Sequence, residues 1–340
     1  MSKAKDISGQ APGGARTRLG DVLPLDTPFV VQVFPLYACN FKCNYCIFSV
    51  KREHQGFISD RTKMDFALYQ KFIDELCEFP RRVKVLRFVG IGEPLMHKRI
   101  VDMVRYASER GVAHTLELLT NGSLLEPRLS DALVAAGLTR MVVSVQGTTA
   151  EKYRDVCGVK LDFERFLDNL RYFYEHRGEV QVYIKIVDCA LDDEADGERF
   201  HQLYSGLCDT IAIENAVPIH SSIDYEGVLK DKDEQLTQFG LPVAEVKICP
   251  QPFFHMQINP DGKIVPCYSW EYPEIVGDCN EQTMTEIWNG EVFQRFRRRM
   301  LDGVKNVCDA CVECNMIKYR LFPEDVLNED AERLKKHYEE

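Results

Sequence analysis

The sequence predicts an α/β protein in which parallel strands form a partial, (β/α)6 TIM-like barrel, followed by a small cysteine-rich C-terminal domain. Between residues 29 and 213, apolar runs of strand length alternate six times with stretches whose apolar residues recur at helical spacing. Six of the 13 cysteines lie in residues 248–320, where this alternation has ended. The length of 340 residues suits one large domain with an appendage. Six units are too few to close an eight-stranded barrel, so we expect an open sheet.

Each expected strand is a short apolar run, and each expected helix has apolar residues three or four positions apart. The helix over 65–79, for example, carries Phe66, Tyr69 and Phe72 on one face. The strands are expected at 29–34, 83–89, 115–119, 141–145, 180–187 and 210–213. The helices between them are expected at 65–79, 98–110, 129–136, 163–176 and 198–207.

The composition of the flanking segments sets the expected domain boundaries. The first residues are polar and of mixed charge, the segment after the sixth unit is charged, and the chain ends in a charged amphipathic stretch. The cysteine-rich part contains two short strands (254–258 and 263–265) around a turn, and one helix (283–300). The expected division is a flexible leader at 1–24, the barrel at 25–223, a connector at 224–247, the cysteine-rich domain at 248–320 and a C-terminal helix at 321–340.

The overall charge and hydropathy exclude several classes of protein. The chain has 42 Lys and Arg against 53 Asp and Glu, a net charge of −11, which argues against nucleic acid or an anionic membrane as the main partner. No signal-peptide core and no apolar run long enough to span a membrane are present. We therefore expect a cytoplasmic protein with reduced thiols, in which clustered cysteines indicate metal rather than disulfides.

The first cysteine cluster is a C-x3-C-x2-C run formed by Cys39, Cys43 and Cys46. It follows the first expected strand, so it lies at the edge of the sheet where the carboxyl ends of parallel strands meet. Three thiolates can ligate three irons of a [4Fe–4S] cube and leave the fourth iron open. An open position of this kind is typical of catalytic metal sites. The structural alternatives for this run are a zinc knuckle or a chance grouping of cysteines.

With Tyr45 directly before its third cysteine, this run resembles the signature of the radical S-adenosylmethionine (SAM) superfamily. The resemblance implies that a [4Fe–4S] cluster binds SAM beside Tyr45. One electron then cleaves the sulfonium, and the resulting 5′-deoxyadenosyl radical removes a hydrogen atom from a substrate. It also implies a flavodoxin- or ferredoxin-type electron donor.

Polar or glycine residues at the ends of the following strands match further elements of that superfamily. The run Gly90-Ile91-Gly92-Glu93-Pro94 follows the second strand, where the family has a "GGE" element that holds the SAM amino group. Residues at the ends of the third and fourth strands, and Lys185 on the fifth, are similar to those that bind the methionyl carboxylate and ribose. Each could equally be an ordinary polar residue at a strand end. The SAM-binding residues implied in this way are Tyr45, Gly90, Gly92, Glu93, Asn121, Ser144 and Lys185.

A second set of cysteines resembles the SPASM/twitch extension of radical SAM enzymes. Cys249 and Cys267 flank the expected hairpin, with Gly262 five positions before the second of them, and a C-x2-C-x2-C run follows. The resemblance implies one auxiliary [4Fe–4S] cluster, because the additional later cysteines of the full form are missing. Which two of the last three cysteines are ligands stays open, and zinc or a second auxiliary cluster that uses Cys279 are alternatives. The implied ligands come from Cys249, Cys267, Cys308, Cys311 and Cys314.

Three further features carry alternative interpretations. Glu214 and His220, at and after the sixth strand, are candidates for a general base or are ordinary surface or capping residues. Cys279, like the remaining cysteines, is either a buried core thiol or the donor of a hydrogen atom in an epimerase. The arginines in 295–299 predict a solvated helix face rather than a nucleic-acid patch.

The resemblance implies an enzyme, a radical SAM oxidoreductase. The expected reaction is oxidation (dehydrogenation) or epimerisation of a small polar molecule such as a sugar or aminocyclitol. The alternative is a peptide-modifying enzyme that forms thioethers, epimerises or oxidises residues of a precursor peptide. An iron–sulfur electron carrier is the non-enzymatic alternative.

Overall fold

The computed structural model of the chain describes residues 3–10, 12, 16–55, 59–229, 235–268 and 270–338. Parts of the expected leader, connector and C-terminal helix lie outside these residues. The strands form one ten-stranded sheet in the order β1-β7-β6-β5-β4-β3-β2-β8-β9-β10. They are β1 (Lys5–Asp6), β2 (Val30–Val33), β3 (Val83–Phe88), β4 (Ala113–Thr120), β5 (Arg140–Val145), β6 (Gln181–Val187), β7 (Thr210–Glu214), β8 (His255–Ile258), β9 (Lys263–Val265) and β10 (Gly277–Asp278).

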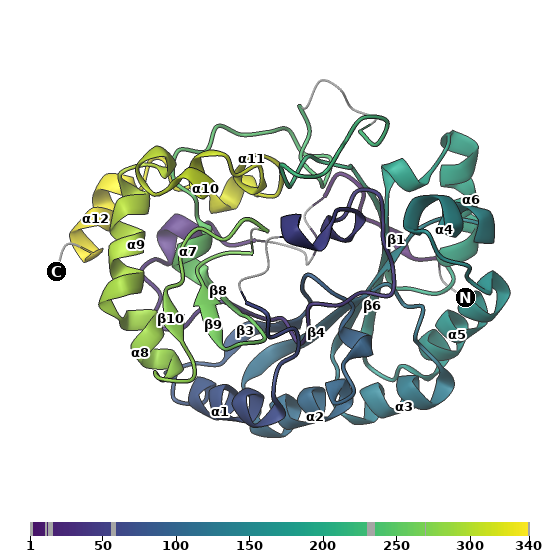
Figure 1. Cartoon of the computed structure of the whole chain (residues 1–340), viewed down its shortest axis with the longest axis horizontal. Helices are drawn as coiled ribbons and strands as arrows, with labels where there is room; N and C mark the ends of the chain where they lie inside the picture. Colours follow the sequence, from purple (N-terminus) through teal and green to yellow (C-terminus); the bar gives the residue numbers. More distant parts are fainter. Residues whose placement is uncertain are drawn as a thin grey trace.

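The strands from β2 to β7 pair in parallel, and helical crossovers join them along the outer side of the curved sheet (Figure 1). This arrangement confirms the partial barrel that the β/α alternation predicted. The helices of the barrel are α1 (Phe66–Leu76), α2 (Ile100–Arg110), α3 (Pro127–Ala135), α4 (Ala150–Cys157), α5 (Phe163–His176) and α6 (Glu194–Tyr204). The later helices are α7 (Gln251–Phe254), α8 (Met284–Asn289), α9 (Glu291–Leu301), α10 (Asp309–Val312), α11 (Met316–Tyr319) and α12 (Ala331–Tyr338).

Alternating residues of each strand divide between an apolar and a polar side of the sheet. In β2, Val31 and Val33 belong to the main apolar core, whereas Gln32 between them is a buried polar residue on the opposite face. On this inner face Glu117 of β4 is 4% exposed at its side chain and forms ion pairs with both Arg87 and Arg140. The barrel therefore has a polar interior, which suits polar ligands at its mouth.

The expected flexible leader differs from the structure in its described part. Lys5–Asp6 pairs in parallel with Thr210 and Ile211 of β7 and extends the sheet at that edge. Leu19 is buried, and Arg18 forms an ion pair with Asp330 at 2.7 Å. These contacts attach the segment to the rest of the protein, although its polar composition predicted a flexible leader.

The cysteine-rich part continues the barrel sheet instead of forming a separate layer. The expected hairpin is present as β8 and β9. However, β8 also pairs in parallel with β2, with Val30 opposite His255 and Val33 opposite Ile258. The strand that precedes the first cysteine run is therefore hydrogen-bonded to the strand that follows Cys249.

Three predictions about the helices of the C-terminal part need correction. The expected helix over 283–300 is divided at Gly290, whose backbone is extended (φ −71°, ψ 154°), into α8 and α9. The expectation of a solvated arginine face is wrong for Arg297, which is 2% exposed and lies over the rings of Trp288 and Phe293. The expected C-terminal helix begins only at Ala331 and packs on α9.

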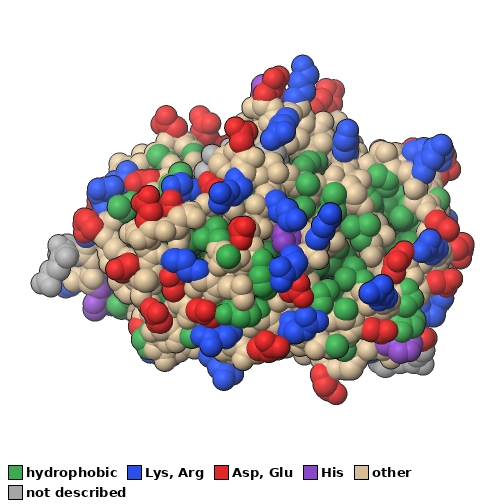
Figure 2. All heavy atoms as spheres, turned by 60° about the horizontal axis from the view of Figure 1, so that its bottom comes forward, with side chains coloured by type: hydrophobic (Ala, Val, Ile, Leu, Met, Phe, Trp, Pro, Cys, Tyr) green, Lys and Arg blue, Asp and Glu red, His purple; other side chains and the backbone are tan. Residues whose placement is uncertain are grey.

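The surface is consistent with the acidic, mixed composition. On the face turned forward in Figure 2, Lys and Arg side chains are intermixed with Asp and Glu. Among the described residues, no helix combines the length and the apolar character needed to cross a membrane.

Candidate active site

The first cysteine run forms a loop directly after β2 and is fixed by backbone hydrogen bonds to α4. Lys42 N–H donates to the carbonyl of Cys157 (3.1 Å), and Asn44 N–H donates to that of Val156 (2.9 Å). Phe41 packs edge-on against Tyr153 of the same helix. Helix α4 was missed in the sequence, although Thr149 as its N-cap and Gly158 as its left-handed C-cap are recognisable signals.

The three thiols of this loop are held in surroundings that disfavour bare thiolates. Burial raises the pKa of Cys39 and of Cys46 to about 12, and negative charge on neighbouring thiols of the loop adds to both shifts. The pKa of Cys43 is raised by its contact with the Cys157 thiol and by burial. Bound iron would supply the positive charge that such thiolates need, so the loop fits an iron–sulfur cluster.

Glu93 of the glycine-containing run connects the ends of three strands. Its N–H donates to the Ala38 carbonyl (2.8 Å) beside the cysteine loop. Its carboxylate accepts hydrogen bonds from the Thr120 hydroxyl (2.7 Å) and from the N–H groups of Asn121 (2.7 Å) and Leu95 (2.9 Å). Burial nevertheless raises the pKa of Glu93 to about 6. Glu93 thus holds the loops after β2, β3 and β4 together, the first through its N–H and the other two through its carboxylate.

Gly92 lets the Glu93 segment approach the cysteine loop. A Cβ atom at Gly92 would lie 2.4 Å from the Leu36 carbonyl oxygen and 2.9 Å from that of Ala38. At Gly90 it would lie 2.7 Å from the ring of Phe34.

We expect Gly92→Ala to weaken SAM binding by about tenfold or more, because the new methyl group displaces the backbone of the cysteine loop. Anaerobic equilibrium binding of SAM to the reconstituted protein measures this change. Gly206→Ala is the matched control, since a Cβ there meets nothing within 4 Å. An affinity of the Gly92 variant equal to that of the control would contradict the proposed role of this contact.

The remaining candidate SAM-binding residues lie at the carboxyl ends of the strands, as expected. Asn121 donates to the side-chain oxygen of Asn40 (2.9 Å) inside the cysteine loop. Tyr45 donates to the side-chain oxygen of Gln146, which follows β5. Ser144 of β5 lies opposite Lys185 of β6 in the sheet register.

Lys185 and Glu214 form a buried ion pair on the inner face of the sheet. Lys185 Nζ lies 2.6 Å from a Glu214 oxygen, with side-chain exposures of 14% and 3%. Glu214 also accepts hydrogen bonds from Tyr183 (3.0 Å) and from Gln238 (2.6 Å), which the sequence did not suggest as a site residue. The Glu214 carboxylate therefore accepts hydrogen bonds from three side chains.

We expect Lys185→Met to lower the free energy of unfolding by about 3 kcal/mol, because it leaves the Glu214 carboxylate buried without its cation. The double variant Lys185→Met/Glu214→Gln should recover part of this loss. Anaerobic urea denaturation of the three proteins measures the coupling. Additive losses in the double variant would show that the pair is not coupled.

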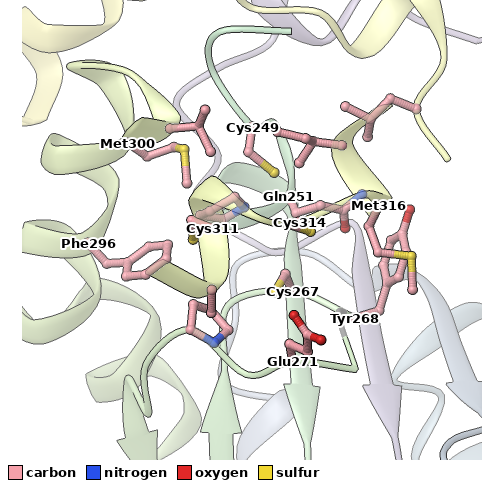
Figure 3. Close-up of a pocket in the computed structure, with 16 residues that line it drawn as sticks. Cys249, Gln251, Cys267, Tyr268, Glu271, Phe296, Met300, Cys311, Cys314 and Met316 are labelled. Atoms are coloured by element: carbon pink, nitrogen blue, oxygen red, sulfur yellow. The ribbon is translucent and has the colours of Figure 1, made fainter. Parts of the chain in front are cut away.

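Four cysteines of the second set line one largely apolar pocket. Figure 3 shows Cys249, Cys267, Cys311 and Cys314 pointing into it, and Phe296 and Met300 of α9 form part of its wall. Burial raises the pKa of Cys249 well above its usual range, and negative charge on Cys314 and Cys267 adds to this shift. Four thiols that face one another in an apolar pocket fit the ligand set of a [4Fe–4S] cluster.

The other two C-terminal cysteines lie outside this set. Cys308 is not part of the pocket lining, and its thiol contacts the Pro273 carbonyl (3.8 Å) next to Cys311. Cys279 is 0% exposed, with its Sγ 3.7 Å from the sulfur of Met284 and its N–H bonded to the Gly262 carbonyl. The structure therefore does not bring Cys279 together with the other candidate ligands.

The described residues contain no group of three or more His, Cys, Asp or Glu side chains placed to hold one metal ion. In a [4Fe–4S] cube each thiolate binds a different iron, so the ligands are spread around the cluster.

Family comparisons agree with the two cysteine sites. Residues 33–195 match the Radical SAM superfamily, and residues 249–315 match SPASM, an iron–sulfur cluster-binding domain. The chain belongs to the radical SAM superfamily and carries a C-terminal SPASM domain. It is a SAM-dependent radical enzyme whose two domains imply SAM and [4Fe–4S] clusters.

Curated relatives of similar length have diverse activities. One is the "tungsten-containing aldehyde ferredoxin oxidoreductase cofactor-modifying protein" of Pyrococcus furiosus, 25% identical over 82% of this chain and 87% of the relative. A PqqA peptide cyclase of Rhodopseudomonas palustris is 26% identical over 84% of this chain and 79% of the relative. An S-adenosyl-L-methionine-dependent 2-deoxy-scyllo-inosamine dehydrogenase of Niallia circulans is 22% identical over 82% and 89%.

Solved structures share the fold. BtrN in complex with AdoMet and 2-DOIA has a TM-score of 0.52 and 20% identity, and covers 86% of this chain and 95% of its own. Streptococcus suis SuiB bound to its precursor peptide SuiA has a TM-score of 0.62 and 15% identity, with 86% and 71% covered.

Proposed function

We propose that this protein catalyses the SAM-dependent dehydrogenation of a small polar molecule such as a sugar or aminocyclitol. The observation that carries the proposal is the pairing of a three-cysteine loop, which leaves a ligand position open, with a separate four-thiol pocket in the same sheet. In a dehydrogenation, a carbon loses a hydrogen atom, and the substrate radical then loses one electron and one proton. An iron–sulfur cluster held in the second pocket would accept that electron.

Cys39, Cys43 and Cys46 would hold a [4Fe–4S] cluster, which when bound supplies the electron that cleaves SAM. Tyr45, Asn121, Ser144 and the glycines at 90 and 92 would contact SAM. Glu93 would hold the loops after β2, β3 and β4 in place through the hydrogen bonds described above. Glu214, a candidate general base from the sequence, is engaged by three donors, and we propose that it positions Lys185 for the methionyl carboxylate.

The placement of Cys279 argues against an epimerase in which this thiol donates the hydrogen atom. An epimerase needs a hydrogen-atom donor that reaches the substrate, whereas Cys279 is fully buried beside Met284 and lies outside the four-thiol pocket. Modification of a precursor peptide is the second candidate, and the similarity to PqqA peptide cyclase and to SuiB supports it. Tight binding of a precursor peptide encoded next to this chain would favour this second candidate.

The test is anaerobic reconstitution of the chain, followed by reduction in the presence of SAM. The proposal expects about eight irons per chain, formation of 5′-deoxyadenosine, and reduction of the second centre when the substrate is consumed. About four irons would contradict an auxiliary centre, and about twelve would indicate a second one. Absence of 5′-deoxyadenosine would contradict the radical mechanism.

We propose Cys249, Cys267, Cys311 and Cys314 as the auxiliary ligands, since these four line one pocket. Cys311→Ser should then lower the iron content by up to four per chain, whereas Cys308→Ser should leave it at the wild-type value. Iron and sulfide analysis together with electron paramagnetic resonance measure both variants. Loss of iron in Cys308→Ser together with a wild-type iron content in Cys311→Ser would make Cys308, and not Cys311, the ligand.

A further inference from the structure

A polar turn lies between the two cysteine sites. Residues 219–225 follow β7, and the Tyr225 hydroxyl accepts hydrogen bonds from the N–H groups of Ile219 (2.9 Å) and His220 (3.2 Å), which close the turn. Burial raises the pKa of Tyr225 to about 12, and negative charge on Cys46 and Glu271 adds to the shift. Tyr225 is thus near the first cysteine loop on one side and near Glu271 on the other.

Glu271 links this turn to the four-thiol pocket. Its side chain lines the pocket together with Cys267 (Figure 3). The same carboxylate accepts hydrogen bonds from the Ser221 hydroxyl (2.6 Å) and the Ser221 N–H (3.1 Å), and His220 Nδ1 lies 3.8 Å from the same oxygen. The hydrogen bonds from Ser221 to Glu271 therefore connect the wall of the pocket to the turn.

Glu271 is an acidic residue in a pocket whose other described lining residues are cysteines, apolar side chains, Tyr268 and Gln251. A negative charge in surroundings of low dielectric constant opposes the addition of an electron nearby. Net charge and hydrogen bonding around an iron–sulfur cluster are among the main determinants of its reduction potential.

We propose that Glu271 keeps the reduction potential of the auxiliary centre low, and that the hydrogen bonds from Ser221 set how strongly it does so. This inference rests on the proposed function, in which the four-thiol pocket holds an iron–sulfur cluster.

Two variants test the proposal because they act in opposite directions. Glu271→Gln removes the negative charge and should shift the potential of the auxiliary centre to a more positive value. Ser221→Ala removes one hydrogen bond that disperses the charge of the carboxylate, so it should shift the potential to a more negative value. Glu281→Gln is the matched control, because it makes the same charge change at an exposed position and should leave the potential unchanged.

The measurement is an anaerobic redox titration of the reconstituted holoprotein, monitored by electron paramagnetic resonance. The auxiliary signal is the one that does not change when SAM is added. A wild-type potential in Glu271→Gln, or shifts of the same sign in both variants, would overturn the inference. Loss of irons in Glu271→Gln would overturn it as well, since Glu271 would then be a ligand. Only about four irons in the wild-type protein would instead contradict the proposed function on which the inference rests.

Discussion

Replacing Cys39, Cys43 and Cys46 together by alanine should abolish the formation of 5′-deoxyadenosine from SAM. Without these thiols the loop after β2 holds no cluster, so no electron reaches the sulfonium. The iron content should fall from about eight to about four per chain, because the four-thiol pocket does not depend on these side chains. Chromatography of the nucleoside products and iron analysis measure the two effects.

Cys77→Ala is the matched control for this variant, since Cys77 is exposed and lies on the outer side of the barrel after α1. It should keep both the nucleoside product and the iron content of the wild type. Formation of 5′-deoxyadenosine by the triple variant would show that SAM is cleaved elsewhere. The assignment of the loop as the SAM site would then be wrong.

Replacing Arg297 by alanine should lower the free energy of unfolding by about 3 kcal/mol or more. The guanidinium donates to the carbonyls of Pro252 (2.9 Å) and Trp288 (2.7 Å). It also packs over the rings of Trp288 and Phe293 at 4.0 Å from each centroid. Alanine would leave two buried carbonyls without donors and a space between the rings.

Anaerobic urea denaturation measures this loss. Arg295→Ala is the control, because its side chain is 53% exposed and its ion pair with Glu274 is 3.5 Å long. We expect that change to cost no more than about 0.5 kcal/mol. Equal effects of the two substitutions would contradict a structural role for the buried guanidinium.

Local patterns were sufficient to predict the barrel and the first cysteine site. Each strand from β2 to β7 is a short apolar run, so its position follows from residue type alone. The cysteine loop follows β2 directly, and the ends of parallel strands meet at one edge of the sheet, so spacing and order place its three thiols together at that edge. The contacts of Glu93 agree with this expectation, because they join the ends of three neighbouring strands.

The sequence could not resolve features that depend on packing between distant segments. Cys308 and Cys311 have the same spacing as Cys311 and Cys314, so only the pocket distinguishes the two pairs. Arg297 lies in a run of charged residues, and its burial results from the rings of Trp288 and Phe293. Glu271 has no motif of its own, and its position follows from the turn that holds it.

The parallel pairing of β8 with β2 has a mechanical consequence for the two cysteine sites. Val33 and Ile258 lie side by side in the sheet, one shortly before the first cysteine loop and the other shortly before Cys267. The separation between the two sites is thus fixed by backbone hydrogen bonds between neighbouring strands and not by a hinge. In the proposed dehydrogenation, electron transfer should therefore not have to wait for a domain movement. A chain cut before Ile248 would expose the edge of β2 and tend to self-associate.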